Sequence, residues 1–289
     1  VSRLHMKGAH MKGDWKTLGA VQEVADLTYK MWERGWDEAN GGNVSYILTD
    51  EEAANLEYVP GTGRSAALMG NVPDSMRGRY VLGTATGSYF REIKDNIDEL
   101  LGIIYLPAEG DDYEIVCGLE NNRPTSELAA HIQTHAVRLS VDPEQRVVMH
   151  NHTTHILAMT HCGPTDEREF TLALWRIITE ALILFPEGVV VFPDGVGLVP
   201  WCVCGTPEIA EQTNEKMKTR RCVVWQYHGV FTTGKSMHDA FGLLETVEKC
   251  AEAWLLAEAC GHRNPGIDDQ GLKDAAAYFG NTLREGYVD

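Results

Sequence analysis

Apolar residues recur at helical spacing near the start of the chain and predict its first secondary-structure element. We expect a helix that begins after Asp14, whose side chain can cap it, and that ends at Gly35, a residue type that favours helix termini. Five apolar residues, three or four positions apart, share one face of this helix: Leu18, Val21, Val24, Leu27 and Met31. The segment is therefore expected to pack one side against a core.

Later parts of the chain alternate between helical spacing and short apolar runs bounded by turn residues. The helical pattern predicts helices over residues 127–139, 170–184, 207–219 and 238–259. The short runs predict strands over residues 44–48, 80–86, 103–106, 113–119, 146–152 and 222–231. Residues 109–112 (Glu-Gly-Asp-Asp) separate the third and fourth of these strands and predict a hairpin.

The order of these elements indicates the fold class. A βαβ repeat would place a helix between nearly every pair of strands, and this chain does not. We therefore expect an α/β domain with a mixed, largely antiparallel sheet, formed by residues 14–289 with a helical tail over 263–289. Residues 1–13 contain two Met-Lys-Gly triplets and are interpreted as an extension or cloning remnant. The near-duplicated stretch 184–197 is interpreted as a local insertion, since two copies cannot build a solenoid.

Composition and charge narrow the classes of partner. With 25 Lys and Arg against 42 Asp and Glu, the formal net charge is −17, which disfavours nucleic acid and anionic membrane surfaces. No apolar stretch has the length of a membrane span or of a signal-peptide core. The seven scattered cysteines are typical of reduced thiols. We expect a soluble, cytoplasmic protein.

The first candidate for chemistry is a pair of histidines in the strand predicted over 146–152. His150 and His152 are two positions apart, so both imidazoles can point to one face and bind one metal ion. The plainer interpretation is a polar strand face. A third ligand is needed, and His228, which ends another predicted strand, is the first choice. Five other histidines remain alternatives, the first two at helical i, i+4 spacing: His131, His135, His155, His161 and His238.

Three further features have both a structural and a functional interpretation. Thr125-Ser126-Glu127 is typical of a helix N-terminus, yet free N–H groups there can also bind phosphate and Glu127 can act as a general base. The glycine-containing turns at 40–43 and 84–88 can present N–H groups to phosphate, although glycine usually serves the turn itself. Cys202 and Cys204 form a thiol pair without a second metal-binding pair at the usual spacing.

The order of these motifs resembles the class II aldolase/adducin family over roughly residues 15–285. The shared pattern is Asn-Gly-Gly-Asn, Thr-x-Thr-Gly, Pro-Thr-Ser-Glu, His-x-His and a late His-Gly. The segments 34–43, 174–180, 192–197 and 228–231 favour the branch of that family that cleaves L-rhamnulose 1-phosphate. The resemblance implies a three-layer α/β/α sandwich and a homotetramer with active sites at subunit interfaces. It also implies zinc-dependent, reversible aldol cleavage to dihydroxyacetone phosphate and L-lactaldehyde.

The same resemblance implies roles for individual residues. His150, His152 and His228 would bind one Zn²⁺ per subunit, Glu127 would be the catalytic acid/base, and Glu180 would lie near the aldehyde end of the substrate. Seven residues would surround the phosphate and the neighbouring hydroxyls: Asn40, Gly42, Asn43, Thr86, Gly87, Thr125 and Ser126. The chain departs from the family pattern in having Ser88 where a lysine is expected, Cys204 where a proline is expected, and a longer 184–197 stretch.

Three alternatives stay open at this point. A sister activity on the same scaffold would be L-fuculose-phosphate aldolase or ribulose-5-phosphate 4-epimerase. A non-catalytic, adducin-like interaction module would lack the metal-ligand residues, all of which this chain has. A zinc hydrolase is disfavoured because the His-Glu-x-x-His helix signature is absent from the sequence.

Overall fold

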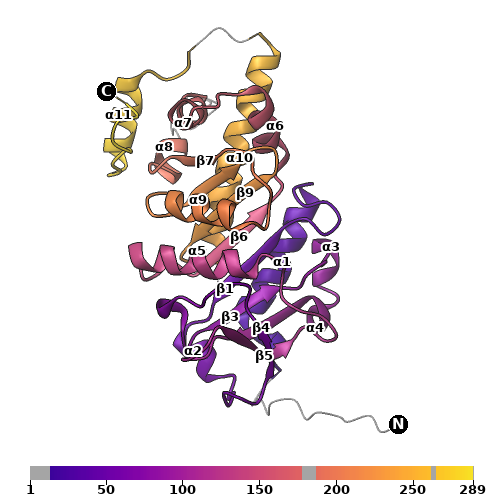
Figure 1. Cartoon of the computed structure of the whole chain (residues 1–289). Helices are drawn as coiled ribbons and strands as arrows, with labels where there is room; N and C mark the ends of the chain where they lie inside the picture. The colour runs from indigo at the N-terminus through magenta and orange to yellow at the C-terminus, as the bar shows by residue number, and fades with distance from the viewer. Residues whose placement is uncertain (1–13, 178–186, 262–264, 289) are drawn as a thin grey trace.

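The computed structural model describes residues 14–177, 187–261 and 265–288 (Figure 1). Its strands form one nine-stranded sheet in the order β2-β5-β4-β3-β1-β6-β9-β8-β7. Every neighbouring pair is antiparallel except β7 and β8, which are parallel. The strands are β1 Asn43–Ile47, β2 Arg64–Ala67, β3 Tyr80–Thr84, β4 Leu101–Tyr105, β5 Asp112–Gly118, β6 Val147–Asn151, β7 Val196–Val199, β8 Cys222–Trp225 and β9 Gly229–Gly234.

Helices lie on both faces of this sheet. The longer ones are α1 Gly19–Glu33, α5 Leu128–Val141, α6 Thr154–Cys162, α7 Glu167–Arg176, α9 Pro207–Met217, α10 Met237–Ala259 and α11 Asp269–Tyr278. The shorter ones are η1 Trp15–Thr17, α2 Asp50–Ala54, η2 Asp74–Met76, α3 Phe90–Ile93, α4 Ile97–Leu100 and α8 Glu187–Val191. The predicted helix after Asp14 is confirmed, and the Asp14 side chain caps η1 just before it.

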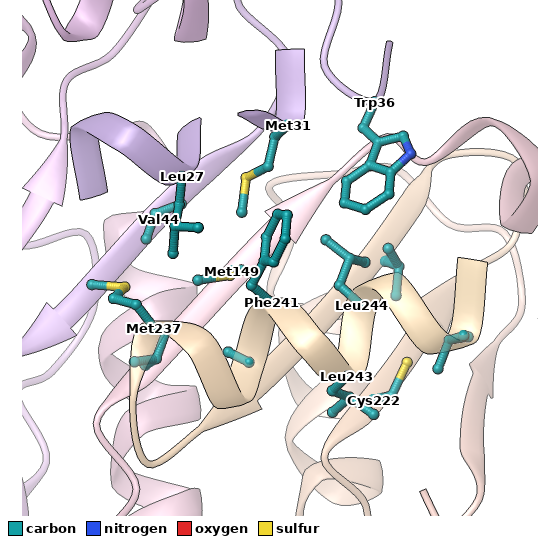
Figure 2. Close-up of a cluster of buried hydrophobic side chains, with 14 of the residues drawn as sticks. Leu27, Met31, Trp36, Val44, Met149, Cys222, Met237, Phe241, Leu243 and Leu244 are labelled. Carbon is teal, nitrogen blue, oxygen red and sulfur yellow. The ribbon is translucent and has the colours of Figure 1, made fainter. Parts of the chain in front are cut away.

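Successive side chains of β6 point to opposite faces of the sheet. Val147 and Met149 belong to the core that contains α1 and α10, whereas Val148 belongs to the core that contains α9. Figure 2 shows the first of these cores, where Met31 of α1 and Phe241 of α10 pack around Met149. Helices therefore cover both sides of a mixed, mostly antiparallel sheet, and the predicted fold class is confirmed.

The register between β1 and β6 places polar residues on the face covered by α5. Asn43 lies opposite His150, and Ser45 lies opposite Val148. Because side chains directly opposite each other in a sheet point to the same side, Asn43, Ser45 and His150 share one face. All three are buried. The α5 face of the sheet is therefore polar at this end.

The prediction of one strand over 222–231 is wrong. The segment forms two antiparallel strands, β8 and β9, joined by Gln226, Tyr227 and His228. Tyr227 has φ 62°, the left-handed conformation that reverses the chain in such short loops. Aromatic residues favour strands, so the local pattern gave no sign of the turn. As a result, His228 stands on a hairpin loop and not within a strand.

Other predicted elements are close to their observed bounds. The hairpin around residues 109–112 is confirmed as β4 and β5, which pair antiparallel. The helix predicted over 170–184 is observed as α7, which ends at Arg176, and residues 178–184 lie outside the described part of the chain. Within the 184–197 stretch, α8 covers Glu187–Val191, and β7 begins at Val196 as an edge strand, so the second copy of the repeat leads into the sheet.

Two earlier interpretations concern residues that the structure does not describe. The extension at 1–13 and Glu180 both lie outside the described residues. Within the described part of the chain, no helix combines the length and apolar character that a membrane crossing requires.

Candidate metal centre

Three histidines from two parts of the chain meet at one end of the sheet. His150 is the fourth residue of β6, His152 follows the end of that strand, and His228 stands on the β8–β9 loop. One nitrogen atom from each imidazole lies within 4.8 Å of the corresponding atom of the other two. The sequence prediction that these three side chains converge is confirmed.

His150 is oriented as a metal ligand would be. Its Nδ1 lies 3.2 Å from the carbonyl oxygen of Val230 and donates to it, while Nε2 is buried without a hydrogen-bond partner. Burial, reinforced by the neighbouring His152 and His228, lowers the pKa of His150 well below its ordinary value and keeps the ring neutral. A neutral imidazole that donates through Nδ1 presents a free lone pair on Nε2, as a metal requires.

Two acidic residues from the segment after α1 hold His152. Its Nδ1 lies 3.2 Å from a carboxylate oxygen of Glu38, and its backbone N–H donates to Asp37 Oδ1, also at 3.2 Å. Asp37 is buried, accepts a second hydrogen bond from the side chain of Asn151, and has its pKa raised to about 7 by that burial. A carboxylate on the far nitrogen of a ligating histidine is a common way to fix its orientation.

His228 completes the group from the hairpin loop. Its pKa is lowered by burial and by the proximity of His152. Gly229 follows it, and a Cβ atom there would lie 2.5 Å from the carbonyl oxygen of Asn151 and 2.9 Å from Cε1 of His150. The approach of the loop to β6 therefore requires a glycine at this position.

Imidazole side chains at three positions fit a catalytic zinc site. Such sites use three protein ligands and keep one position for water or substrate. The unpartnered Nε2 of His150 supports this fit independently of any resemblance, since a buried ring nitrogen without a partner is otherwise costly. Among the described residues, His150, His152 and His228 are the group of potential ligands that converges in this way.

Glu127 lies beside this group, immediately before α5. Its Oε2 accepts a hydrogen bond of 2.9 Å from Nδ2 of Asn43, and its backbone N–H donates to Thr125 Oγ1 at 3.3 Å. The negative charge of Glu127 acts on His228, whose pKa it raises against the larger effect of burial. Glu127 also lines a cavity of about 770 Å³ between α5 and α9, together with Trp225. Glu127 is thus close enough to His228 to act on its charge, and it borders a cavity that none of the three histidines lines.

The turn after β3 and the segment before α5 lie side by side. A β-bridge pairs Ala85 with Pro124, Thr86 N–H donates to the carbonyl of Arg123, and Thr125 N–H donates to the carbonyl of Thr84. These contacts bring together four residues predicted to surround the phosphate: Thr86, Gly87, Thr125 and Ser126. Ser88, which replaces an expected lysine, is buried, and its hydroxyl donates to the carbonyl of Ala85.

The remaining predicted phosphate-binding residues lie on the turn before β1. Asn40 is exposed, Gly42 has φ 80°, and Asn43 is buried with its side chain directed to Glu127. At Gly42, a Cβ atom would collide with the carboxylate of Asp37. The turn is therefore packed against the acidic residues that hold His152.

The other histidines have different partners. His131 and His135 are buried on α5 and both contact Ser45 Oγ, at 2.6 and 2.8 Å. His155 pairs with buried Glu248 at 2.8 Å. The ring of His161 contacts that of Tyr227 at an angle of 40°, and exposed His238 lies 3.4 Å from Glu23. Cys202 and Cys204 are free thiols.

Sequence reasoning missed Asp37, Glu38 and Ser45 as parts of this site. Asp37 and Glu38 stand between the first predicted helix and the Asn-Gly-Gly-Asn turn, so their position next to a candidate motif was the available signal. Their contacts with Asn151 and His152 join residues 114 positions apart, which no local pattern reveals.

The chain belongs to the class II aldolase family. The family model described as "Class II Aldolase and Adducin N-terminal domain" matches residues 22–255. The recognition of this family from the order of motifs is thereby confirmed.

Individual relatives agree with that assignment. Rhamnulose-1-phosphate aldolase of Listeria monocytogenes serotype 4b (strain CLIP80459) is 42% identical over 275 residues, which cover 93% of this chain and 96% of the relative. Rhamnulose-1-phosphate aldolase of Enterococcus faecalis (strain ATCC 700802 / V583) is also 42% identical, over 93% of this chain and 94% of its own. A crystal structure of a sugar-phosphate aldolase from Thermotoga maritima superposes with a TM-score of 0.69 and 28% identity, covering 86% of this chain and 98% of that one.

Proposed function

We propose that this protein is a zinc-dependent lyase that cleaves L-rhamnulose 1-phosphate reversibly to dihydroxyacetone phosphate and L-lactaldehyde. The observation that carries the proposal is the convergence of His150, His152 and His228 next to Glu127. The relatives named rhamnulose-1-phosphate aldolase, which align over nearly the whole chain, favour this substrate.

The three imidazoles would hold one Zn²⁺ per subunit. When bound there, the ion supplies Lewis-acid stabilisation of the negative charge that develops on the ketose oxygens as the carbon–carbon bond breaks, worth several kcal/mol. Three neutral ligands suit this task because they leave the full double charge of the ion uncompensated. Imidazole nitrogen is also a ligand type that zinc prefers.

Glu127 would act as the acid/base on the three-carbon half of the substrate. When the bond between C3 and C4 breaks, the C4 hydroxyl loses its proton and becomes the aldehyde, and the electron pair of the bond stays with the C3 half. The carboxyl form of Glu127 would then give a proton to C3, so the number of protons is unchanged; in the aldol direction its carboxylate would remove the C3 proton and the aldehyde oxygen would gain one. The electrostatic effect of Glu127 on His228 supports this role. Glu180 would lie near the aldehyde half, as the family resemblance implies.

The phosphate group would be held where the turn after β3 meets the start of α5. The backbone N–H groups of Thr86 and Thr125 already donate to protein carbonyls, so the expected donors are the N–H groups of Gly87 and Ser126 and the side-chain hydroxyls of Thr86, Thr125 and Ser126. Asn40, Gly42 and Asn43 would complete the enclosure. The grouping of the donor residues by the Ala85–Pro124 bridge supports the assignment. Anchoring the phosphate would align the reacting carbons with Glu127.

We further propose a cytoplasmic homotetramer with active sites at subunit interfaces. The exposure of Met69, of which 84% is accessible at the edge of the Glu127 cavity, supports a contact with another subunit there. Methionine is enriched in interfaces and rarely so exposed. Light scattering coupled to size-exclusion chromatography measures the assembly directly, and a monomer would contradict this part of the proposal.

The central test combines metal analysis with product analysis. The purified protein should contain about one zinc per chain by mass spectrometry and should release dihydroxyacetone phosphate from L-rhamnulose 1-phosphate faster than from L-fuculose 1-phosphate. Ribulose 5-phosphate should not be epimerised. Preference for fuculose or ribulose phosphate would assign a sister activity, and a metal-free protein without any of the three activities would favour an interaction module.

A further inference from the structure

Four buried polar side chains connect Glu127 to the interior of the protein. Glu127, His131 and His135 are spaced four residues apart along the start and length of α5, so they share one face of the helix. Asn43 and Ser45 are two residues apart on β1 and share the sheet face that this helix covers. Side chains from α5 and from β1 alternate along the series, and each contacts the next one on the other element.

The contacts form an unbranched chain. Asn43 Nδ2 donates to Glu127 Oε2 at 2.9 Å, and Asn43 Oδ1 contacts His131 Nε2. His131 Nδ1 lies 2.6 Å from Ser45 Oγ, which lies 2.8 Å from His135 Nε2. Asn43, Ser45, His131 and His135 are all buried, with exposed fractions between 0 and 7%.

The chemistry of the groups assigns a direction to every hydrogen bond. A carboxylate only accepts, so Asn43 must donate to Glu127 and offer its oxygen to His131. His131 must then carry its proton on Nε2, and its Nδ1 must accept from the Ser45 hydroxyl. The hydroxyl proton is thereby used, so Ser45 accepts from His135 Nε2–H. In each of the four hydrogen bonds, the donor is the group farther from Glu127 and the acceptor is the group nearer to it.

Both histidines have the protonation that this assignment needs. Burial lowers the pKa of His131 to about 4 and that of His135 well below its ordinary value. Each ring is therefore neutral near pH 7, with one donor and one acceptor nitrogen. A charged His131 would have two donors and could not accept from Ser45.

We propose that His131, Ser45 and His135 are positioning residues that fix the amide of Asn43 so that it holds one carboxylate oxygen of Glu127 and leaves the other to reach the substrate. The inference rests on the proposed function, because it takes Glu127 as the acid/base. It assigns a purpose to the α5 histidines other than binding metal. Their effect on the reaction passes through Asn43.

The decisive experiment compares replacements of His131 in the metal-loaded enzyme. His131→Gln keeps an N–H near the position of Nε2, whereas His131→Asn is too short to place one there. We expect His131→Asn to lower kcat roughly 10- to 100-fold, the cost of a misplaced catalytic group, with KM within about twofold and zinc content unchanged. His131→Gln should recover most of the loss. His238→Gln, on the exposed face of α10, is the matched control and should leave kcat unchanged.

Two further measurements distinguish positioning from general packing. Ser45→Ala, a small change that is expected to fold, should also lower kcat with zinc retained. In a protein that already carries Asn43→Leu, His131→Asn should cause little additional loss of kcat, because the hydrogen bonds by which His131 acts on Glu127 are already absent. Equal kcat values for the Asn, Gln and wild-type proteins overturn the proposal. It is also overturned if the Gln and Asn variants lose activity equally, or if each loss follows lost zinc.

The tautomer of His131 can be measured without an activity assay, so it tests this inference independently of the proposed function. Solid-state NMR of the ¹⁵N-histidine-labelled, zinc-loaded protein should show His131 as the Nε2–H tautomer, with the signal assigned from its loss in His131→Gln. An Nδ1–H tautomer refutes the chain of donors. If the wild-type protein cleaves none of the sugar phosphates, the proposed function fails, and the tautomer alone then decides whether the chain of hydrogen bonds exists.

Discussion

The carboxylate of Glu38 lies 3.2 Å from Nδ1 of His152 and joins the end of the first helical segment to the metal centre. Most of this carboxylate is exposed, so its main effect is on the orientation of the ring and not on the charge of a buried site. Because Nδ1 of His152 is engaged by Glu38, its Nε2 is left for a metal ion. His150 has the same arrangement, with Nδ1 bonded to a carbonyl oxygen and Nε2 without a partner.

Glu38→Gln should therefore weaken metal binding without abolishing it. We expect about 10- to 100-fold lower zinc affinity, the usual cost of losing a carboxylate behind a ligating histidine. Competition with a chromogenic chelator measures the affinity. Glu51→Gln, on the exposed surface of α2, is the control. Unchanged affinity in Glu38→Gln would show that this contact does not orient the ring.

His152→Ala should lose both zinc and activity. Two imidazoles remain, fewer than the three protein ligands typical of a catalytic zinc site. The measurement is zinc per chain after dialysis, together with cleavage of L-rhamnulose 1-phosphate. A fully active zinc-free variant would contradict the assignment of His152 as a ligand.

Glu127→Gln should keep its zinc and lose about 10²- to 10⁴-fold in turnover, the range that a general acid/base contributes. Because glutamine has nearly the same shape, the metal centre should be unaffected. NMR in D₂O follows exchange of the C3 proton of dihydroxyacetone phosphate, which should be slow in the variant. Exchange at the wild-type rate would remove Glu127 from the acid/base role.

Gly229→Ala should disturb the metal centre through the backbone. The new Cβ would approach the carbonyl of Asn151 to 2.5 Å and Cε1 of His150 to 2.9 Å, and overpacking of this kind typically costs about 1–3 kcal/mol. We expect lower zinc content and a lower Tm. Gly242→Ala on α10, where the added Cβ has no neighbour within 4 Å, should be neutral or slightly stabilising. The same response in both variants would argue against a specific contact at Gly229.

Acid should destabilise the metal-free protein through His131. Burial lowers the pKa of this residue to about 4 in the folded state, below the ordinary 6.5. Between these values the unfolded chain binds a proton that the folded chain does not, so the free energy of unfolding falls as the pH drops below 6.5. The loss is complete near pH 4 and amounts to roughly 3 kcal/mol. Urea unfolding from pH 7 to 4.5 should show a smaller decrease for His131→Gln. Parallel curves for the two proteins would contradict the shifted pKa.

The sequence by itself predicted the class of the fold and, together with the family resemblance, the three histidines that converge. The spacing of His150 and His152 on a strand predicts that both rings can point to one place, because side chains alternate along a strand. The hydrophobic pattern likewise located α1, α10 and the β4–β5 hairpin. These features depend on neighbours in sequence, which a single chain displays directly.

Only the tertiary structure showed which other side chains contact the predicted site residues. The spacing of His131 and His135 on α5 suits a metal as well as a hydrogen-bonded core, and it was the opposing Ser45 that resolved the alternatives. The turn that contains His228 lies within a run of strand-forming residues, so the local pattern did not predict it. Sheet register and burial determine partners 80 to 115 residues apart in the chain, and such contacts arise from the packing of whole elements, which local periodicity does not encode.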